Sequence, residues 1–540
     1  MIKLIGGKVY DPINGVDGKA SDIYVRDGKI IPTPDDTDKY TVYDIAGSVV
    51  MPGAIDIHTH IGGGKVNIAR CMMNDVHGAG CEGNEFDTHN TGIRYAEMGY
   101  TACFEPAMLA CNARQAHLEM ADTPCVDTGA YVMLDNTDLL LKLLATKADP
   151  KTIRDYVAWM IDKTQAMAVK VVNPGGINAF KFNQRKLDID EASVPYEVSP
   201  RQIVECLTRT LNELNTPHPL HVHTSNLGVP GNYKTTLDTI KAAAGHPMHL
   251  THVQFHSYGN EGDHRFSSAA AEIAEAINDN PHLSTDVGQI MFGQTVTISG
   301  DTMMQHANHR HASPDKWALV DIETEAGCGV VPFKYRDKNF VNALQWIIGL
   351  EIFLLVRDPW RVFLTTDHPN GAPFTSYPHL IRLLMDRSYR IDMLSRLHPE
   401  ARKMSTLDSI KREYTLYEIA IMTRAAPARS LGLHNKGHLG VGADADIVVY
   451  TPSQDTEQMF AHPRYVFKNG ELMVKDGKVI KMPKTYTHVV KPEYDNSIEK
   501  IIKAHYNDYR TVGFENSQIS NTEMAEQIGS PIVEHPCQTP

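Results

Sequence analysis

The stretch MPGAIDIHTH, Met51 to His60, restricts the fold more than any other part of the sequence. A proline and a glycine open it, an apolar run follows, and His58 and His60 close it with one residue between them. Side chains at positions i and i+2 of a strand point to the same side, so both imidazoles can face one interior point. At the C-terminal end of a barrel strand, such a pair would be placed to bind one metal ion. A lone His-x-His motif also arises by chance, with one ring in solvent.

Residues 51–430 alternate short apolar runs with longer amphipathic segments. The helical segments include SPRQIVECLTRTLNELN, where Ser199 precedes Pro200 as an N-cap, and NALQWIIGLEIFLLVRDP, which Asp358-Pro359 ends. This rhythm predicts an α/β fold, a (β/α)8 TIM-like barrel with long loops. A doubly wound sheet is the alternative, but no Gly-x-Gly-x-x-Gly motif follows the first strand. The predicted strand-like runs are YTACFEPAM (100–108), INAFKFN (177–183), PLHVHTS (219–225), MHLTHVQFH (248–256), HLSTDVGQI (282–290) and RVFLTTDHP (361–369).

Both ends of the chain have the texture of short strands separated by turns. Residues 1–50 alternate apolar and polar residues between Gly-Gly, Asp-Gly and Pro turns, and residues 431–486 repeat this pattern with Asn469-Gly470 and Asp476-Gly477 as hairpin turns. We therefore expect one small β-sandwich built from both chain ends. Residues 487–540 are polar with one helical segment, and we interpret them as an extension that packs on this chain or serves as a subunit-docking arm.

Composition narrows the classes of function. The formal net charge of -13 argues against nucleic acid as a partner, and no apolar stretch is long enough to cross a membrane. The N-terminus has no cleavable signal pattern, and the eight cysteines form no Cys-x-x-Cys pair, so we expect a cytoplasmic protein with reduced thiols and no iron–sulfur cluster of its own. The 26 histidines make a metal centre worth testing.

Four later segments supply metal-ligand residues near the ends of apolar runs: Lys181, His223, His252 and Asp367. His221 points the same way as His223, so the alternation of side chains along a strand cannot separate the two. His249 and His256 are likewise alternatives to His252. Three neighbouring residues are candidates for substrate contacts: His256, Tyr258 and His368. Alternatively, His368 supports the neighbouring Asp367. The segment Gly62–Lys65 lacks phosphate-loop spacing, so we interpret it as letting backbone approach the metal site.

This ordered ligand set resembles the amidohydrolase superfamily, which carries His-x-His on strand 1, Lys on strand 4, His on strands 5 and 6 and Asp on strand 8. The resemblance implies that His58, His60 and Asp367 hold one zinc ion and that His223 and His252 hold another. In this superfamily the strand-5 ligand ends its strand and is followed by a small polar residue, which favours His223 and leaves His221 in the core or behind the ligands. By the same reasoning we prefer His252 over His249 and His256. Lys181, as N6-carboxylysine, would bridge the two ions. It further implies that Asp367 moves a proton between the attacking water and the leaving amine.

Longer segments, among them IDIHTHIGGGKVNIAR, LHVHTSNLGVPGNYKTT and TTDHPNGAPFTSYPHLIRLL, resemble the family of formylmethanofuran dehydrogenase A subunits. The resemblance implies condensation of formate with the amine of methanofuran, or the reverse hydrolysis. It places the reduction of CO2 to formate on partner subunits that hold molybdenum or tungsten pterin and iron–sulfur clusters. A bacterial relative works in a formyltransferase/hydrolase complex.

Two other interpretations use the same residues. A stand-alone cyclic-amide hydrolase similar to dihydropyrimidinase would need the same ligand set. A metal-free scaffold subunit would need none of it, and metal analysis separates that possibility from the others.

Overall fold

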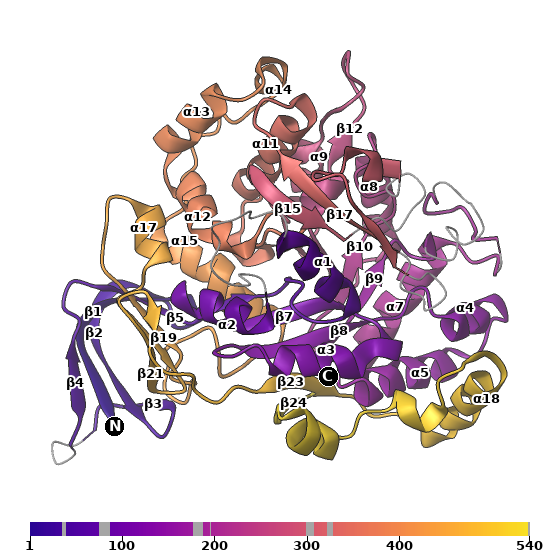
Figure 1. The fold of residues 1–540 in the computed structure, drawn as a ribbon, viewed down its shortest axis with the longest axis horizontal. Helices are drawn as coiled ribbons and strands as arrows, with labels where there is room; N and C mark the ends of the chain where they lie inside the picture. The colour runs from indigo at the N-terminus through magenta and orange to yellow at the C-terminus, as the bar shows by residue number, and fades with distance from the viewer. Residues whose placement is uncertain are drawn as a thin grey trace.

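A barrel of parallel strands forms the centre of the molecule (Figure 1). The computed structural model describes residues 1–34, 39–74, 87–176, 187–194, 196–298, 307–320 and 328–537. Within these ranges, consecutive barrel strands pair in parallel along the chain, and a parallel bridge between Thr59 and His368 joins the segments after the first and last of them. The predicted TIM-like barrel is therefore confirmed. Its strands are β6 (Ala54–Asp56), β7 (Tyr100–Met108), β8 (Asp127–Met133), β9 (Ala168–Val172), β10 (Leu220–His223), β11 (Met248–Leu250), β14 (Leu283–Asp286) and β18 (Val362–Phe363).

The fourth barrel strand lies ahead of the segment in which we predicted it. β9 is the sequence AVKVV, whose four apolar residues suit a buried strand, while the lysine at its centre weakens that pattern. The predicted segment INAFKFN lies outside the described residues.

Helices cover the outside of the barrel. Ser199 caps α7 (Pro200–Leu214) with a full capping box, as its sequence predicts. The most apolar helix, α11 (Phe340–Leu355), is buried on nearly every side. The others are α2 (Thr88–Glu97), α3 (Ala113–Ala121), α4 (Asp138–Ala145), α5 (Pro150–Lys163), α8 (Tyr233–Ala242), α9 (Ala270–Asp279), α12 (Tyr377–Met385), α13 (Arg387–Ser395), α14 (Pro399–Lys403), α15 (Leu416–Ala420), α16 (Ala426–Ser430) and α17 (Thr456–Ala461).

A second sheet joins the two ends of the chain, as predicted (Figure 1, left). The N-terminal strand β5 pairs with the C-terminal strand β19, for example Val50 with Val449, and both side chains are buried in the core of this domain. The boundaries proposed for this domain, 1–50 and 431–486, remain predictions. Its strands are β1 (Ile2–Asp11), β2 (Val16–Arg26), β3 (Lys29–Ile31), β4 (Thr41–Asp44), β5 (Val49–Pro52), β19 (Ile447–Tyr450), β20 (Tyr465–Lys468), β21 (Glu471–Lys475) and β22 (Lys478–Val479).

The C-terminal extension packs on its own chain. β23 (Thr487–Lys491) pairs with β8 at Thr487 and Thr128, and β24 (Ile532–Pro536) pairs with β23. α18 (Glu499–Tyr509) lies next to α5, where the Trp159 indole donates to Glu499 at 3.1 Å. Docking of this extension to another subunit remains a prediction.

A small sheet and one helix lie over the end of the barrel at which the strands finish. The sheet consists of β15 (Gly293–Thr297), β16 (Ala318–Val320) and β17 (Cys328–Tyr335), and α1 (Gly64–Asn74) packs against it through Ala69. A short hairpin of β12 (Tyr258–Gly259) and β13 (Ser267–Ser268) follows the sixth strand. Among the helices of the described ranges, none has the length and hydropathy to cross a membrane.

Candidate active site

His58 and His60 converge on a single carboxylate. β6 ends at Asp56, so both histidines lie on the extended segment just beyond the strand. The Nε2 atom of His58 lies 2.9 Å from Asp367 Oδ1, and that of His60 lies 3.3 Å from the same oxygen. The motif that opens the barrel and the residue after its last strand therefore meet at one point, as their order in the sequence predicts.

Glu105, inside the second barrel strand, holds the loop that carries His60. One carboxylate oxygen lies 2.9 Å from His60 Nδ1, and the other accepts hydrogen bonds from the amides of Ile61 and Gly62 at 2.7 and 3.0 Å. Burial disfavours the charged form of the His60 ring, but the Glu105 and Asp367 carboxylates outweigh burial and raise its pKa. Because Glu105 accepts from Nδ1, the Nε2 atom of His60 can serve as a ligand.

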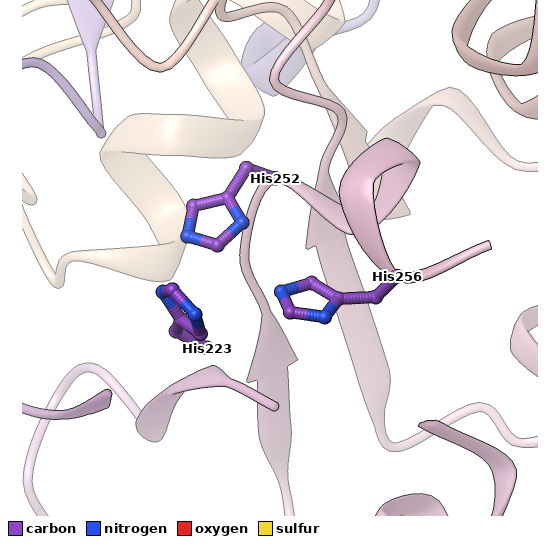
Figure 2. A group of neighbouring side chains, drawn as sticks. All are labelled: His223, His252 and His256. Carbon is purple, nitrogen blue, oxygen red and sulfur yellow. The ribbon is translucent and has the colours of Figure 1, made fainter. Parts of the chain in front are cut away.

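Three imidazoles from different elements face one another beside this pair (Figure 2). His223 ends β10, His252 follows β11, and His256 ends the 3-10 turn η3 (Val253–His256). Each offers a ring nitrogen within 4.8 Å of the others, and His58, His252 and Asp367 form a second group of the same kind. Within the described residues, His223 Nε2, His252 Nδ1, both His256 nitrogens and Asp367 Oδ2 are buried without a hydrogen-bond partner. Buried donor atoms left open in this way fit a metal centre.

Two of these residues sit in strained backbone. Asp367 has φ 52° and His252 has φ 34°, in the left-handed region that few non-glycine residues adopt. Burial raises the pKa of Asp367, although His60 and Lys170 act in the opposite direction. The side chain can therefore take up a proton more readily than an exposed aspartate.

Lys170 is the lysine that the fourth barrel strand carries. It is buried, lines the same cavity as His60, His223 and Asp367, and forms no hydrogen bond or ion pair with the described residues. Burial lowers its pKa to about 8, which leaves part of the amine neutral and nucleophilic near neutral pH. Lys181, which we predicted in this role, lies outside the described residues.

The cavity between these groups encloses about 40 Å³, and residues from the start of α1 form part of its lining. Gly62, Gly63 and Gly64 form part of its wall. That this segment lets the backbone approach a metal ion remains a prediction. A Cβ atom at Gly62 would lie 2.9 Å from the carbonyl oxygen of Ala116, so a larger residue would displace the loop. Lys65 also lines the cavity, and its ammonium has no ion-pair partner among the described residues.

Two predicted substrate contacts point elsewhere. The Tyr258 hydroxyl accepts hydrogen bonds from Gln254 and Gln345 at 2.8 and 2.9 Å, and Tyr258 does not line the cavity. His368 turns its Nδ1 toward the Phe374 amide, 3.3 Å away, and burial lowers its pKa to about 3. As contacts to a substrate, both residues remain untested predictions.

Lys170 and Glu105 were not identified as candidate site residues from the sequence. Each lies inside an apolar strand, where the surrounding residues suggest only a buried position. A charged residue in such a strand is itself a signal, because it is costly to bury unless it is paired or functional. Reading AVKVV and ACFEPAM in that way would have identified both.

Gly288, two residues after the end of β14, allows the backbone there to approach His252 closely. Its φ is +65°, and an added Cβ would lie 2.4 Å from the Cβ of His252 and 2.8 Å from its Cα. We expect Gly288→Ala to displace His252, to lower metal content and to destabilise the fold by about 1–3 kcal/mol. Metal analysis and thermal unfolding measure the two effects. Gly245→Ala is the matched control, because Gly245 has φ +85° with nothing within 4 Å; equal losses in both variants would contradict the steric explanation.

Comparisons with known proteins agree with this geometry. The chain is 38% identical over 542 residues to the A subunit of the Fhc formyltransferase/hydrolase complex of Methylorubrum extorquens, covering 98% of each chain. It is 39% identical over 548 residues to protein FwdA of Methanocaldococcus jannaschii, covering 95% of this chain and 96% of that one. The resemblance to the A-subunit family is thereby confirmed.

Solved structures show the same relationship. The crystal structure of the formyltransferase/hydrolase complex FhcABCD from Methylorubrum extorquens, determined with methylofuran, contains a chain that superposes with a TM-score of 0.94 at 37% identity and full coverage of both chains. A D-aminoacylase structure shares the fold alone, with a TM-score of 0.50 and 16% identity over 89% of this chain and 98% of that one. A family model described as the amidohydrolase family matches residues 41–480. The chain belongs to the amidohydrolase family.

Proposed function

We propose that this chain makes and breaks the formamide bond of an N-formylated carrier amine of the methanofuran type. The observation that carries the proposal is the cavity of about 40 Å³ lined by His60, Lys170, His223, His252 and Asp367. Its volume holds only a few water-sized groups, which suits a one-carbon acyl unit. The end-to-end similarity to a subunit whose complex was solved with methylofuran supports the choice of carrier.

The donor set fits two divalent metal ions of the zinc type. Imidazole and carboxylate are ordinary zinc ligands, and the open nitrogens of His223 and His252 and the open oxygen of Asp367 lie in one buried region. We assign His58, His60 and Asp367 to one ion and His223 and His252 to the other, with His256 close enough to join the second group. When bound, the ions would polarise the formyl oxygen and lower the pKa of water.

Lys170 is the residue that we propose for the bridging position. A free ammonium would repel two dications, whereas a carbamate offers an anionic oxygen to each. The neutral amine attacks the carbon of CO2, a N–C bond forms, and one proton leaves. Because the pKa of Lys170 is about 8, its amine is neutral more often near neutral pH than that of an exposed lysine, and it reacts more readily with CO2. Lys181 is the alternative that the family resemblance suggested, and alanine variants of the two lysines separate these possibilities.

Asp367 moves the proton in both directions of the proposed reaction. Its Oδ1 is held by the Asn370 amide at 3.0 Å and by the two histidines, which leaves Oδ2 open. In hydrolysis this oxygen takes a proton from the attacking water and delivers it to the nitrogen as the C–N bond breaks, releasing formate and the amine. In condensation it receives the proton that the amine loses as it attacks the carboxyl carbon of formate, and it passes this proton to the formate oxygen that leaves as water when the C–O bond breaks.

Release of formate tests the function. The protein, purified with any subunits that accompany it and loaded with Zn2+, is incubated with N-formylmethanofuran labelled with carbon-13 at the formyl group, and NMR follows labelled formate. We expect formate to appear, and to stop appearing after a chelator removes the metal. Ring opening of hydantoins without release of formate would instead support the cyclic-amide hydrolase.

The subunits that copurify with this chain identify the kind of complex in which the reaction takes place. We propose a heteromeric complex because one relative is the A subunit of such a complex. Partners that hold molybdenum or tungsten and iron–sulfur clusters would indicate coupling to CO2 reduction in the cytoplasm. Partners without redox centres would indicate a formyltransferase/hydrolase complex.

Lys65 provides a test of how the anionic substrate is held. Lys65 lines the cavity and has no ion-pair partner among the described residues, so we expect it to attract formate. Lys65→Met should raise the KM for formate in condensation by about tenfold with little change in kcat, because a hydrogen bond to a charged group contributes that much. Lys65→Arg is the conservative control and should restore most of the affinity. An unchanged KM in the methionine variant would contradict this role.

A further inference from the structure

A chain of imidazoles runs from His58 through the interior of the barrel to its opposite end. His58 Nδ1 lies 2.8 Å from His221 Nε2, and His221 Nδ1 lies 3.0 Å from His218 Nε2. His218 Nδ1 lies 3.1 Å from the carbonyl oxygen of Ser430. All three rings are fully buried in a region that barrels ordinarily fill with apolar side chains.

We propose that the Ser430 carbonyl, acting through His218 and His221, fixes the tautomer of His58 that leaves Nε2 open for a metal ion. This inference rests on the proposed metal site. A neutral imidazole has one N–H donor and one acceptor, so the proton position on one ring determines that on the next.

The contact with Ser430 at the far end of the imidazole chain determines which nitrogen of each ring donates. A carbonyl oxygen can only accept, so His218 donates from Nδ1 and accepts at Nε2. His221 then donates from Nδ1 and accepts at Nε2, and His58 in turn donates from Nδ1. Burial lowers the pKa of His218 to about 3, which keeps this ring neutral. Ser430 is the last residue of α16, where a carbonyl lacks a helical partner, and the described residues provide no other donor to it.

At the His58 end, Thr251 favours the same direction, whereas Asp367 Oδ1, 2.9 Å from His58 Nε2, favours a proton on Nε2 as long as no metal ion occupies that position. Thr251 Oγ1 lies 2.5 Å from His58 Nδ1 and donates its own hydrogen to Asp286 Oδ2 at 2.7 Å, so it acts as an acceptor toward His58. Asp286 is fixed in turn by the His249 ring at 2.9 Å and the His252 amide at 2.7 Å. His218 and His221 are thus positioning residues, since neither reaches the cavity.

The Ser430 hydroxyl is the competing terminus. Its Oγ also lies 3.1 Å from His218 Nδ1 and could donate, which would reverse the chain and place the proton on His58 Nε2. Ser430→Ala removes that possibility and leaves the carbonyl in place. We therefore expect this variant to bind Zn2+ as tightly as the wild type.

Zinc affinity of the purified full chain, measured by competition with a chromophoric chelator, tests the proposal. His218→Leu should bind Zn2+ about 10–100-fold more weakly, as losses of partners behind metal ligands do, and His218→Gln should recover affinity because its amide oxygen can accept from His221. Equal affinity in wild type and His218→Leu, or weak binding in Ser430→Ala, would overturn the tautomer chain alone. Failure of the wild type to bind Zn2+ would overturn the metal site together with it.

A second measurement does not depend on how the variants fold. Neutron diffraction of deuterium-exchanged wild-type crystals loaded with Zn2+ should show deuterium on Nδ1 of His58, His221 and His218. Deuterium on the Nε2 atoms of these rings would overturn the proposal.

Discussion

Asp367→Asn is expected to lower kcat by about 10³-fold, in the range of general acid–base contributions, while the fold remains intact. The amide cannot accept the proton that Oδ2 receives, and it replaces the carboxylate that lies 2.9 and 3.3 Å from the Nε2 atoms of His58 and His60. Steady-state release of formate from the N-formyl carrier measures the effect.

The control for this variant is Asp392→Asn, because Asp392 lies on the surface and, among the described residues, its carboxylate pairs only with Arg396. It should retain full activity. Asp367→Asn with more than about a tenth of wild-type kcat would contradict the proton-transfer role, since loss of a general acid–base costs at least about 10²-fold.

Lys170→Ala is expected to reduce both metal content and activity, the latter by about 10³-fold, because loss of a bridging ligand removes several kcal/mol of metal assistance. A small carboxylate such as acetate, supplied in the medium, should restore part of the activity by entering the space that the side chain leaves. Native mass spectrometry of the wild type near neutral pH should show the mass of one added CO2, which Lys170→Ala should lack.

Two matched variants sharpen this test. Lys403→Ala removes an exposed lysine and should change nothing. Lys181→Ala removes the lysine that the family resemblance suggested. Loss of metal and of the CO2 adduct in Lys181→Ala but not in Lys170→Ala would contradict our assignment and return the bridge to Lys181.

The sequence allowed prediction of the parts of the fold that local patterns specify. His58, His223 and Asp367 each follow an apolar run, and their order along the chain is the order of the strands, so their meeting at one end of the barrel could be expected. The N-cap of α7 at Ser199 and the β-domain built from both chain ends could also be predicted, because turn and cap residues act locally.

Side-chain partners across the barrel could not be predicted in the same way. The contacts from Glu105 to His60 and from His221 to His58 join residues 45 and 163 positions apart. Nothing in the local pattern of either segment identifies the other. The position of the fourth strand was predicted wrongly for a different reason. Lys170 interrupts the apolar run of β9, which hides the strand in the sequence. The later segment INAFKFN instead has the lysine that we expected near the end of this strand.

Anomalous diffraction at the zinc absorption edge, from crystals grown with Zn2+ and bicarbonate, tests the central claim most directly. We predict two peaks, one beside His58, His60 and Asp367 and one beside His223 and His252, with electron density for a carbamate on Lys170 between them. No zinc peak among these side chains, or a pair of peaks bridged at Lys181, would contradict the account.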